Sequence, residues 1–195
     1  MLARRPAALV DGHWIDFALQ HLDPTLSVAR TFARIAAIRR ETPDMTTLLL
    51  APNGRFRGFV PGQHVPVRVV LGGVVHERCY SPTSEPHDPR LAITVKRHPS
   101  GTVSRWVADV AAVGDVVELG PAAGDFVLPP TPTPFLFIAG GSGITAVSSL
   151  LRAALRARAA ADAVLLYYAR TPADFAFAGL LRDLAARHPR VRIEF

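Results

Sequence analysis

The sequence predicts a β plus α/β chain, in which a six-stranded antiparallel (Greek-key) barrel precedes a parallel α/β unit. The first observation is a period of two in the apolar residues before residue 128, as in Val65, Val67 and Val69, which is typical of half-buried strands. The second is a stretch with four prolines, residues 128–134, which can continue neither a strand nor a helix. The third is the alternation of short apolar runs with helical patterns beyond it, which predicts parallel strands joined by helices.

The barrel strands are separated by turn signals at short intervals, such as Pro61-Gly62 and Gly72-Gly73. Many short strands with such turns predict a sandwich or a barrel. One helix, near Val103 to Ala112, interrupts them. The strand cores are expected at Arg30–Arg40, Met45–Leu50, Gln63–Leu71, Val74–Ser81, Leu91–Arg97 and Asp115–Leu119.

Residues 1–30 are expected to form a leader ahead of the barrel. Within it, His13–Leu19 can form a short amphipathic helix, which ends at Asp23-Pro24 because the residue before a proline disfavours helical geometry. We expect this leader to lie across the rest of the protein.

The α/β unit follows the proline-rich linker, residues 129–134. Phe135–Ala139 is apolar without alternation, as expected of a strand that is buried on both faces. The order strand, helix, strand, helix, strand predicts a parallel sheet with right-handed crossovers. The later elements are expected as a helix with Ile144, Val147, Leu151 and Leu155 on one face, a strand at Ala163–Tyr168, a helix at Ala173–Arg187 and a strand at Val191–Phe195. Because open sheets of this kind generally have more than three strands, we expect a truncated unit.

Composition excludes several classes of function. The chain of 195 residues has a net charge of +6, but no aromatic-rich basic motif or recognition-helix pattern predicts nucleic-acid binding. No apolar run approaches the roughly 20 residues of a membrane span. The single cysteine, Cys79, can form no disulfide within the chain and cannot by itself hold an iron–sulfur cluster. These features predict a cytoplasmic protein without a metal site of its own.

The first motif with chemical content is Arg78-Cys79-Tyr80-Ser81, at the end of a predicted strand. Arginine offers a planar fork for phosphate, tyrosine a flat face for a ring system, and serine a hydroxyl for a ring nitrogen. A surface arginine beside a core tyrosine is the alternative interpretation.

The second motif joins Val95-Lys96-Arg97, at the end of a strand, to Gly101-Thr102-Val103-Ser104, at the start of a helix. The first amides of a helix have no intrahelical partner and the helix dipole favours an anion there, so this turn suits a pyrophosphate. The alternative is an ordinary helix start that Ser100 or Thr102 caps.

The third motif, Gly140-Gly141-Ser142-Gly143-Ile144-Thr145, lies between a buried strand and a helix. Glycines at such a turn let the backbone approach a phosphate. The spacing differs from the commonest dinucleotide fingerprint, and no lysine follows as in a P-loop. A tight structural turn is the alternative.

In this order, the three motifs and Gly120–Phe126 resemble the ferredoxin–NADP reductase superfamily over about Thr31 to Phe195. The chain looks most like bacterial flavodoxin or ferredoxin reductases that have a leading helical extension and a C-terminal iron–sulfur domain. The resemblance implies a helical leader at 1–30, an FAD-binding barrel at 31–128, a linker at 129–134 and a partial NAD(P)-binding domain at 135–195.

The resemblance also implies roles for the motif residues. Arg78 would pair with flavin phosphate and Tyr80 would stack on the flavin, while Ser81, near flavin N5, and Thr145, near the flavin edge, are the catalytic candidates. Arg170 follows the second strand of the α/β unit and can meet a 2′-phosphate, which favours NADPH, with NADH as the other option. The remaining candidates are Val95, Lys96, Arg97, Gly101, Thr102, Val103 and Ser104 for FAD, and Gly140, Gly141, Ser142, Gly143, Ile144 and Thr145 for the nicotinamide nucleotide.

The implied function is electron transfer from NAD(P)H through FAD to a one-electron carrier, which would be ferredoxin, flavodoxin or an iron–sulfur domain that serves an oxygenase or a desaturase. The sequence departs from the family pattern at Ala146, where proline is usual, and at Pro82, where an apolar residue is usual. The stretch that completes the nucleotide sheet and a four-cysteine domain are both missing from the sequence. A flavin-binding fragment that cannot take a hydride, or an electron-transfer subunit, is therefore the alternative.

Overall fold

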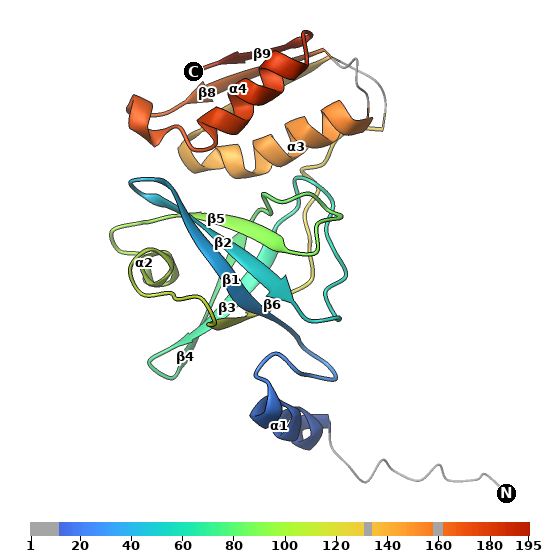
Figure 1. Ribbon diagram of the computed structural model, residues 1–195, viewed down its shortest axis with the longest axis vertical. Helices are drawn as coiled ribbons and strands as arrows, with labels where there is room; N and C mark the ends of the chain where they lie inside the picture. The colour runs from blue at the N-terminus through green and yellow to red at the C-terminus, as the bar shows by residue number, and fades with distance from the viewer. Residues whose placement is uncertain (1–11, 131–133, 158–161) are drawn as a thin grey trace, which may run out of the picture.

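The computed structural model describes residues 12–130, 134–157 and 162–195, and its elements follow the predicted order (Figure 1). Residues 1–11 of the leader and 131–133 of the linker lie outside this description. The barrel occupies the middle of the molecule, with the α/β unit at one end and the leader helix at the other (Figure 1).

Six antiparallel strands form the barrel in the order β4-β3-β6-β1-β2-β5. This is a Greek-key order, because β6, the last strand in sequence, lies between β1 and β3. A bridge between Pro82 and Ile93 brings the end of β4 to β5. The strands are β1 Thr31–Thr42, β2 Met45–Pro52, β3 Val65–Leu71, β4 Val74–Tyr80, β5 Leu91–Lys96 and β6 Val116–Leu119. All six predicted strand cores are confirmed.

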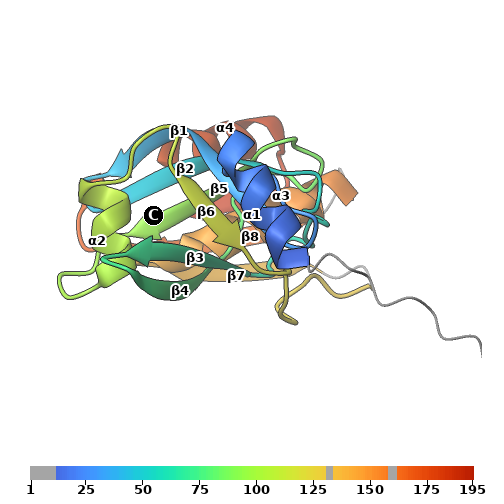
Figure 2. The ribbon, with the colours of Figure 1, turned by 90° about the horizontal axis from the view of Figure 1, so that it is seen from below.

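Along each barrel strand, alternate side chains point into the barrel and form its core. Val65, Val67 and Val69 point inwards and are buried with the inward-facing residues of the other strands. Helix α2, Thr102–Asp109, connects β5 to β6 and packs beside β2, β4 and β5 at one side of the barrel (Figure 2). It ends earlier than the predicted Ala112.

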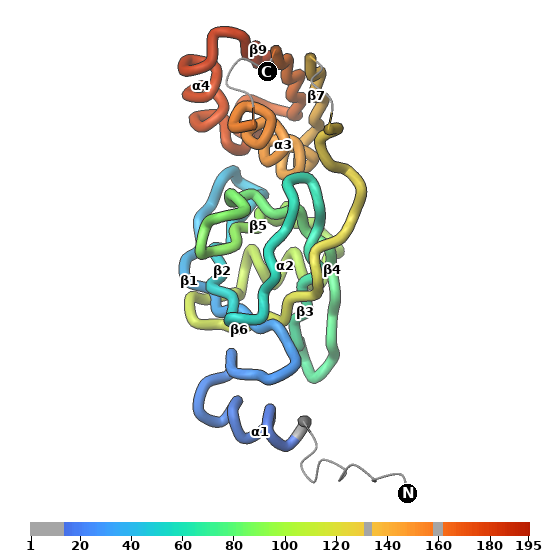
Figure 3. The backbone as a smooth tube through the Cα atoms, turned by 90° about the vertical axis from the view of Figure 1, so that its right-hand side faces the viewer, coloured from blue at the N-terminus to red at the C-terminus, as the bar shows by residue number. Residues whose placement is uncertain are grey.

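The α/β unit is a parallel sheet of three strands in sequence order, β7 Phe135–Gly140, β8 Ala163–Tyr168 and β9 Val191–Glu194. Helices α3, Ile144–Ala157, and α4, Ala178–Arg187, pack on the same face of this sheet. They do so because the strands follow one another in one direction, so crossovers of one hand place both helices on one side. Helix α3 lies between the sheet and the barrel (Figures 1 and 3).

The prediction that the first strand of this unit is buried on both faces was wrong. In β7, Phe137 and Ala139 face the helices and are buried, whereas Leu136 is 63% exposed and Ile138 is 62% exposed. Within the described ranges, no helix covers the second face of the sheet. An unbroken apolar run shows that both faces of a strand could be buried. Burial of the second face also requires another element that packs on it, which the run itself does not predict.

The helix predicted at Ala173–Arg187 also begins later than expected. Pro172–Asp174 is a separate short 3₁₀ turn, in which Thr171 and Asp174 cap each other. Phe177 then adopts a φ of 61°, in the left-handed region. A left-handed residue cannot continue a right-handed helix, so α4 begins only at Ala178.

The leader helix α1, Gly12–Leu22, ends ahead of Asp23-Pro24 as predicted, but it lies at the end of the barrel and does not run along both units (Figure 1). The Asp16 carboxylate fixes it, because Asp16 accepts hydrogen bonds from Ser27 Oγ at 2.7 Å and from the Val28 amide at 2.6 Å. Hydrogen bonds to the carboxylate form lower the pKa of Asp16, which keeps this tether ionised at neutral pH.

Candidate functional site

Strand β4 presents the first motif at the edge of the barrel sheet. Arg78 is exposed, and its guanidinium donates to the Glu77 carbonyl at 2.6 Å. Tyr80 is half-buried against the barrel core, and this burial raises the pKa of Tyr80 to about 12, although the Arg78 charge opposes the rise. The phenol is therefore a hydrogen-bond donor at neutral pH. Ser81 is half-buried, and its hydroxyl has no partner among the described residues.

The start of α2 has no side-chain cap. Gly101 is the N-cap residue, so the alternative in which Ser100 or Thr102 caps the helix is wrong. The Ser104 hydroxyl accepts a hydrogen bond from the His98 amide at 3.1 Å, which holds the preceding loop. The amides of Thr102, Val103 and Ser104 have no acceptor within the described chain and are free for an anion.

Gly101 is required by the space around it. A Cβ atom at this position would lie 2.3 Å from Ser104 Oγ, far inside contact distance. Any larger residue would therefore displace the hydroxyl or the first turn of the helix.

The barrel brings these two motifs to the same side. Helix α2 packs beside β4 and β5, and Tyr80 and Trp106 flank the core cluster that contains Val103. The exposed edge of β4 and the free amides of α2 thus border one surface, as a ligand with both a ring and a pyrophosphate requires. The side chains of Val95 and Val103 are buried in the core, so only their backbone atoms can meet a ligand.

Arg97 does not face the free amides. Its guanidinium forms a bidentate pair with Asp109, at 3.0 and 3.1 Å, at the opposite end of α2. In this arrangement Arg97 fixes the helix to β5 and would reach a phosphate only by leaving Asp109.

The glycine motif forms a braced turn at the carboxyl end of β7. Residues Gly141–Gly143 make a 3₁₀ turn, and Gly141 has a φ of 51°, which suits glycine. Thr145 Oγ1 donates to the Ser142 carbonyl at 3.0 Å, and the Tyr167 hydroxyl donates to the Gly141 carbonyl at 3.4 Å. Ile144 is fully buried, so it can offer a ligand only its backbone.

Lys96 and Arg170 meet between the barrel and the α/β unit. Asp44 Oδ2 lies 3.3 Å from Lys96 Nζ and 3.1 Å from an Arg170 guanidinium nitrogen. Lys96 also lies over the glycine turn, because a Cβ on Gly141 would be 3.5 Å from its Nζ atom. A cavity of about 280 Å³ opens here, lined by Lys96, Gly141, Tyr168, Ala169, Arg170 and Asp174.

A second contact fixes the segment after Ser81 to α3. Glu85 pairs with Arg152 at 3.1 Å and also with Arg156. Arg152 donates in addition to the Thr83 carbonyl. The end of the first motif is therefore held against the helix that carries Thr145 in its first turn.

Sequence reasoning did not find Asp44 or Glu85. Each is an ordinary acidic residue between two strands, and each pairs with basic residues that are far away in the sequence. Neither composition nor spacing signals such a pair.

Two family descriptions match the chain. The oxidoreductase FAD-binding domain matches residues 33–127, and the oxidoreductase NAD-binding domain matches residues 137–195. The chain belongs to the ferredoxin–NADP reductase superfamily. The fold, the oxidoreductase class and the two cofactor classes that the sequence predicts are thereby confirmed.

Several members of the ferredoxin–NADP reductase superfamily resemble this chain. An NADPH oxidoreductase of Mycobacterium tuberculosis is 38% identical over 184 residues, which are 91% of this chain and 48% of that protein. The ferredoxin reductase component of a 3-ketosteroid-9-alpha-monooxygenase of Mycolicibacterium smegmatis is 38% identical over 167 residues, 80% of this chain and 46% of that protein. The chain therefore spans about half the length of these curated relatives.

Solved structures of superfamily members show the same fold. A cytochrome P450 reductase of Amycolatopsis superposes with a TM-score of 0.75 at 30% identity, covering 84% of this chain and 50% of that one. The FAD/NAD-binding domain of a nitric oxide dioxygenase of Vibrio cholerae has a TM-score of 0.78 at 26% identity, and the match covers 85% of this chain and 72% of that one.

Among the residues that the structure describes, no helix is long and apolar enough to cross a membrane.

Proposed function

We propose that the chain binds one FAD across β4 and α2 and passes electrons from a nicotinamide nucleotide to a one-electron carrier. The observation that carries the proposal is that the stretch from Arg78 to Ser81 and the three free amides of α2 lie on one side of the barrel. When bound, the flavin would accept a hydride from the nucleotide and release electrons singly.

The flavin proposal assigns each part of the first two motifs a task. Arg78 pairs with flavin phosphate, Tyr80 packs on the ring or its ribityl chain, and the partner-free Ser81 hydroxyl lies near N5. The backbone amides of Thr102 to Ser104 hold the pyrophosphate. Val95, Lys96, Arg97 and Gly101 complete the border of the site, with Val95 acting through its backbone and Arg97 through its hold on α2.

The nucleotide proposal places NAD(P)H at the turn from Gly140 to Thr145, with Thr145 nearest to the flavin edge. The Lys96 ammonium beside Gly141 and the 75% exposed Arg170 supply positive charge for phosphate groups. Arg170 is the group that would distinguish NADPH from NADH, because a guanidinium can bind a 2′-phosphate through two parallel hydrogen bonds.

The proposed electron acceptor is an iron–sulfur protein or domain, or a flavodoxin. This rests on the relatives that are ferredoxin reductase components of monooxygenases. A cytoplasmic setting for this exchange fits the single cysteine of the chain.

Anaerobic reduction tests the proposal. Protein reconstituted with FAD should be yellow and should bleach faster with NADPH than with NADH. Protein that is yellow but bleaches only with dithionite would show the flavin-binding fragment, and protein that ignores FAD would end both interpretations.

A substitution at Arg170 tests the proposed preference for NADPH over NADH. Arg170→Gln should lower the NADPH over NADH preference by about tenfold, the effect of losing one charge-assisted contact. Arg192→Gln is the matched control, because Arg192 is also 75% exposed and also pairs with a carboxylate. An unchanged preference in Arg170→Gln would remove Arg170 from the nucleotide site.

A further inference from the structure

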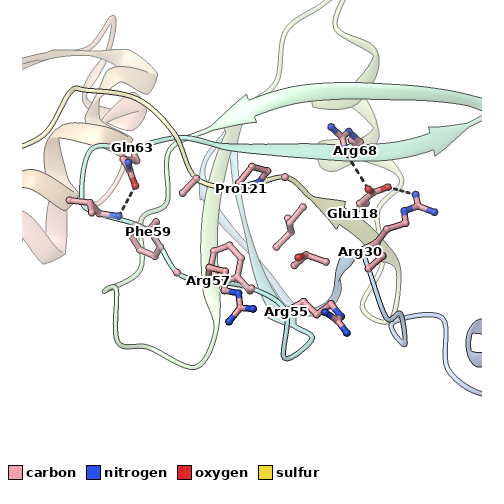
Figure 4. A pocket seen from close by; sticks show the side chains of 16 residues that line it. Arg30, Arg55, Arg57, Phe59, Gln63, Arg68, Glu118 and Pro121 are labelled. Atoms are coloured by element: carbon pink, nitrogen blue, oxygen red, sulfur yellow. Dashed lines mark hydrogen bonds and ion pairs between the residues drawn. The ribbon is translucent and has the colours of Figure 1, made fainter. Parts of the chain in front are cut away.

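A larger cavity lies on the barrel, away from the flavin and nucleotide motifs. Its volume is about 580 Å³, within the range of small-molecule sites. It is formed by the end of the leader, the loop between β2 and β3, and β6 with the turn that follows (Figure 4). No residue of the three motifs lines it, whereas Gly120, Pro121 and Ala122 of the stretch Gly120–Phe126 do.

One part of the wall of this cavity is apolar. Leu119 and Gly120 form a buried floor. Phe56, Phe59 and Pro121 line the sides. Such walls suit a flat apolar body.

Positive charge surrounds these walls. Four arginines and one carboxylate line the cavity, namely Arg30, Arg55, Arg57, Arg68 and Glu118 (Figure 4). Glu118 pairs with Arg30 and, at 3.1 Å, with Arg68. Burial alone would raise the pKa of Glu118, but the hydrogen bonds and charges of Arg30 and Arg68 lower it, so this carboxylate is ionised at neutral pH.

Among the described residues, neither Arg55 nor Arg57 forms an ion pair with a carboxylate, although the Arg55 charge contributes to the lowered pKa of Asp16. Arg55 uses its Nε atom to donate to the Ser27 carbonyl at 2.9 Å. Arg57 has no hydrogen-bond or ion-pair partner in the described part of the chain. Both belong to the same loop at the rim (Figure 4). Gly58, the residue after Arg57, has a φ of 81°.

We propose that this cavity binds a small organic anion with a flat apolar body and one carboxylate or phosphate group. The body lies between Phe56, Phe59 and Pro121, and the anionic group pairs with Arg57 and the free end of Arg55. A planar guanidinium can bind either anion through two hydrogen bonds. The site is separate from the proposed flavin and nucleotide sites, so its test does not depend on them.

Titration calorimetry on the full chain, without FAD and again with FAD in excess, tests the site, with naphthoate and naphthyl phosphate as probes and naphthalenemethanol as the neutral analogue. At least one of the two anions should bind, and whichever binds more tightly identifies the anionic group. The neutral alcohol should bind about tenfold more weakly or not at all. Equal binding of alcohol and anions, no binding of either anion, or release of the bound anion by NADPH would overturn the proposal.

Three variants locate the bound probe. Arg57→Gln should weaken anion binding about tenfold, whereas Arg90→Gln, an exposed arginine outside the cavity with no partner in the described chain, should leave it unchanged. Ala29→Trp, at an exposed lining position, should block the cavity and abolish binding. Wild-type affinity in both Arg57→Gln and Ala29→Trp would show that the probe binds elsewhere.

Discussion

Gly101 shows how a single residue can decide whether the pyrophosphate end of the proposed site forms. The first turn of α2 keeps its amides free because the N-cap residue has no side chain and because the Ser104 hydroxyl accepts its hydrogen bond from the His98 amide in the preceding loop. The same position leaves no room for a Cβ, which would meet Ser104 Oγ at 2.3 Å.

Gly101→Ala should therefore weaken FAD binding by about tenfold or more, because either Ser104 or the free amides must move. Quenching of flavin fluorescence on titration measures this. Gly179→Ala is the control, since no atom lies within 4 Å of a Cβ there and the change in helix α4 should leave FAD affinity unchanged. A folded Gly101→Ala protein with wild-type affinity would contradict the assignment of the α2 amides.

Asp44 is the residue that links the flavin motif to the nucleotide motif. Its carboxylate holds both Lys96 and Arg170, and so it occupies the cations that the nucleotide proposal assigns to phosphate.

Asp44→Asn should tighten the binding of 2′-phospho-AMP by roughly fivefold, because the amide neither competes for Arg170 nor repels the phosphate. Calorimetry measures this without any flavin. Asp183→Asn, at an exposed position on α4, is the control for the change in net charge. Weaker binding in Asp44→Asn would show that Asp44 positions the cations for phosphate and does not compete with it.

At the scale of elements, the barrel could be predicted because alternating burial is directly visible in the sequence, as it is for Val65, Val67 and Val69. The second face of β7 could not, because what covers a strand depends on other elements. The start of α4 could not, because the left-handed Phe177 has no compositional signal.

The residues of the candidate site also fall into those that the sequence could predict and those that it could not. The motif residues could be named because each combines a turn with a chemical group in a short stretch. The Asp44 and Glu85 contacts, which join distant segments, require the fold.

Because one face of the three-stranded sheet is buried and the other exposed, substitutions on the two faces should differ in their effect on the free energy of unfolding. Leu165→Ala, at a fully buried position of β8, should lower the free energy of unfolding by about 2–5 kcal/mol. Ile138→Ala, on the exposed face of β7, should change it by less than about 0.5 kcal/mol. Urea denaturation compares the two, and a large loss in Ile138→Ala would mean that this face is packed in solution.

The whole molecule depends on the junction of its two units. Met45 of the barrel strand β2 is buried in the core of the α/β unit, and Gly62 approaches Leu150 of α3 so closely that a Cβ would lie 2.9 Å from its side chain. The Glu85 pairs with Arg152 and Arg156 add a charged contact at the same junction.

Glu85→Gln should lower the free energy of unfolding by about 1–3 kcal/mol, since it leaves the largely buried Arg152 without its carboxylate. It should also slow flavin reduction by NADPH, because the segment after Ser81 loses its ion pairs with α3. Glu194→Gln, at a half-exposed position, is the control. Unchanged stability together with an unchanged reduction rate would show that this contact does not align the units.

In the proposed flavin site, β4 and the start of α2 hold opposite parts of a single FAD molecule. Side-by-side titration of the protein with FAD and with FMN tests this arrangement most directly, because only FAD has a pyrophosphate for the α2 amides. FAD should bind about a hundredfold more tightly than FMN. Equal affinities for the two flavins would contradict this arrangement.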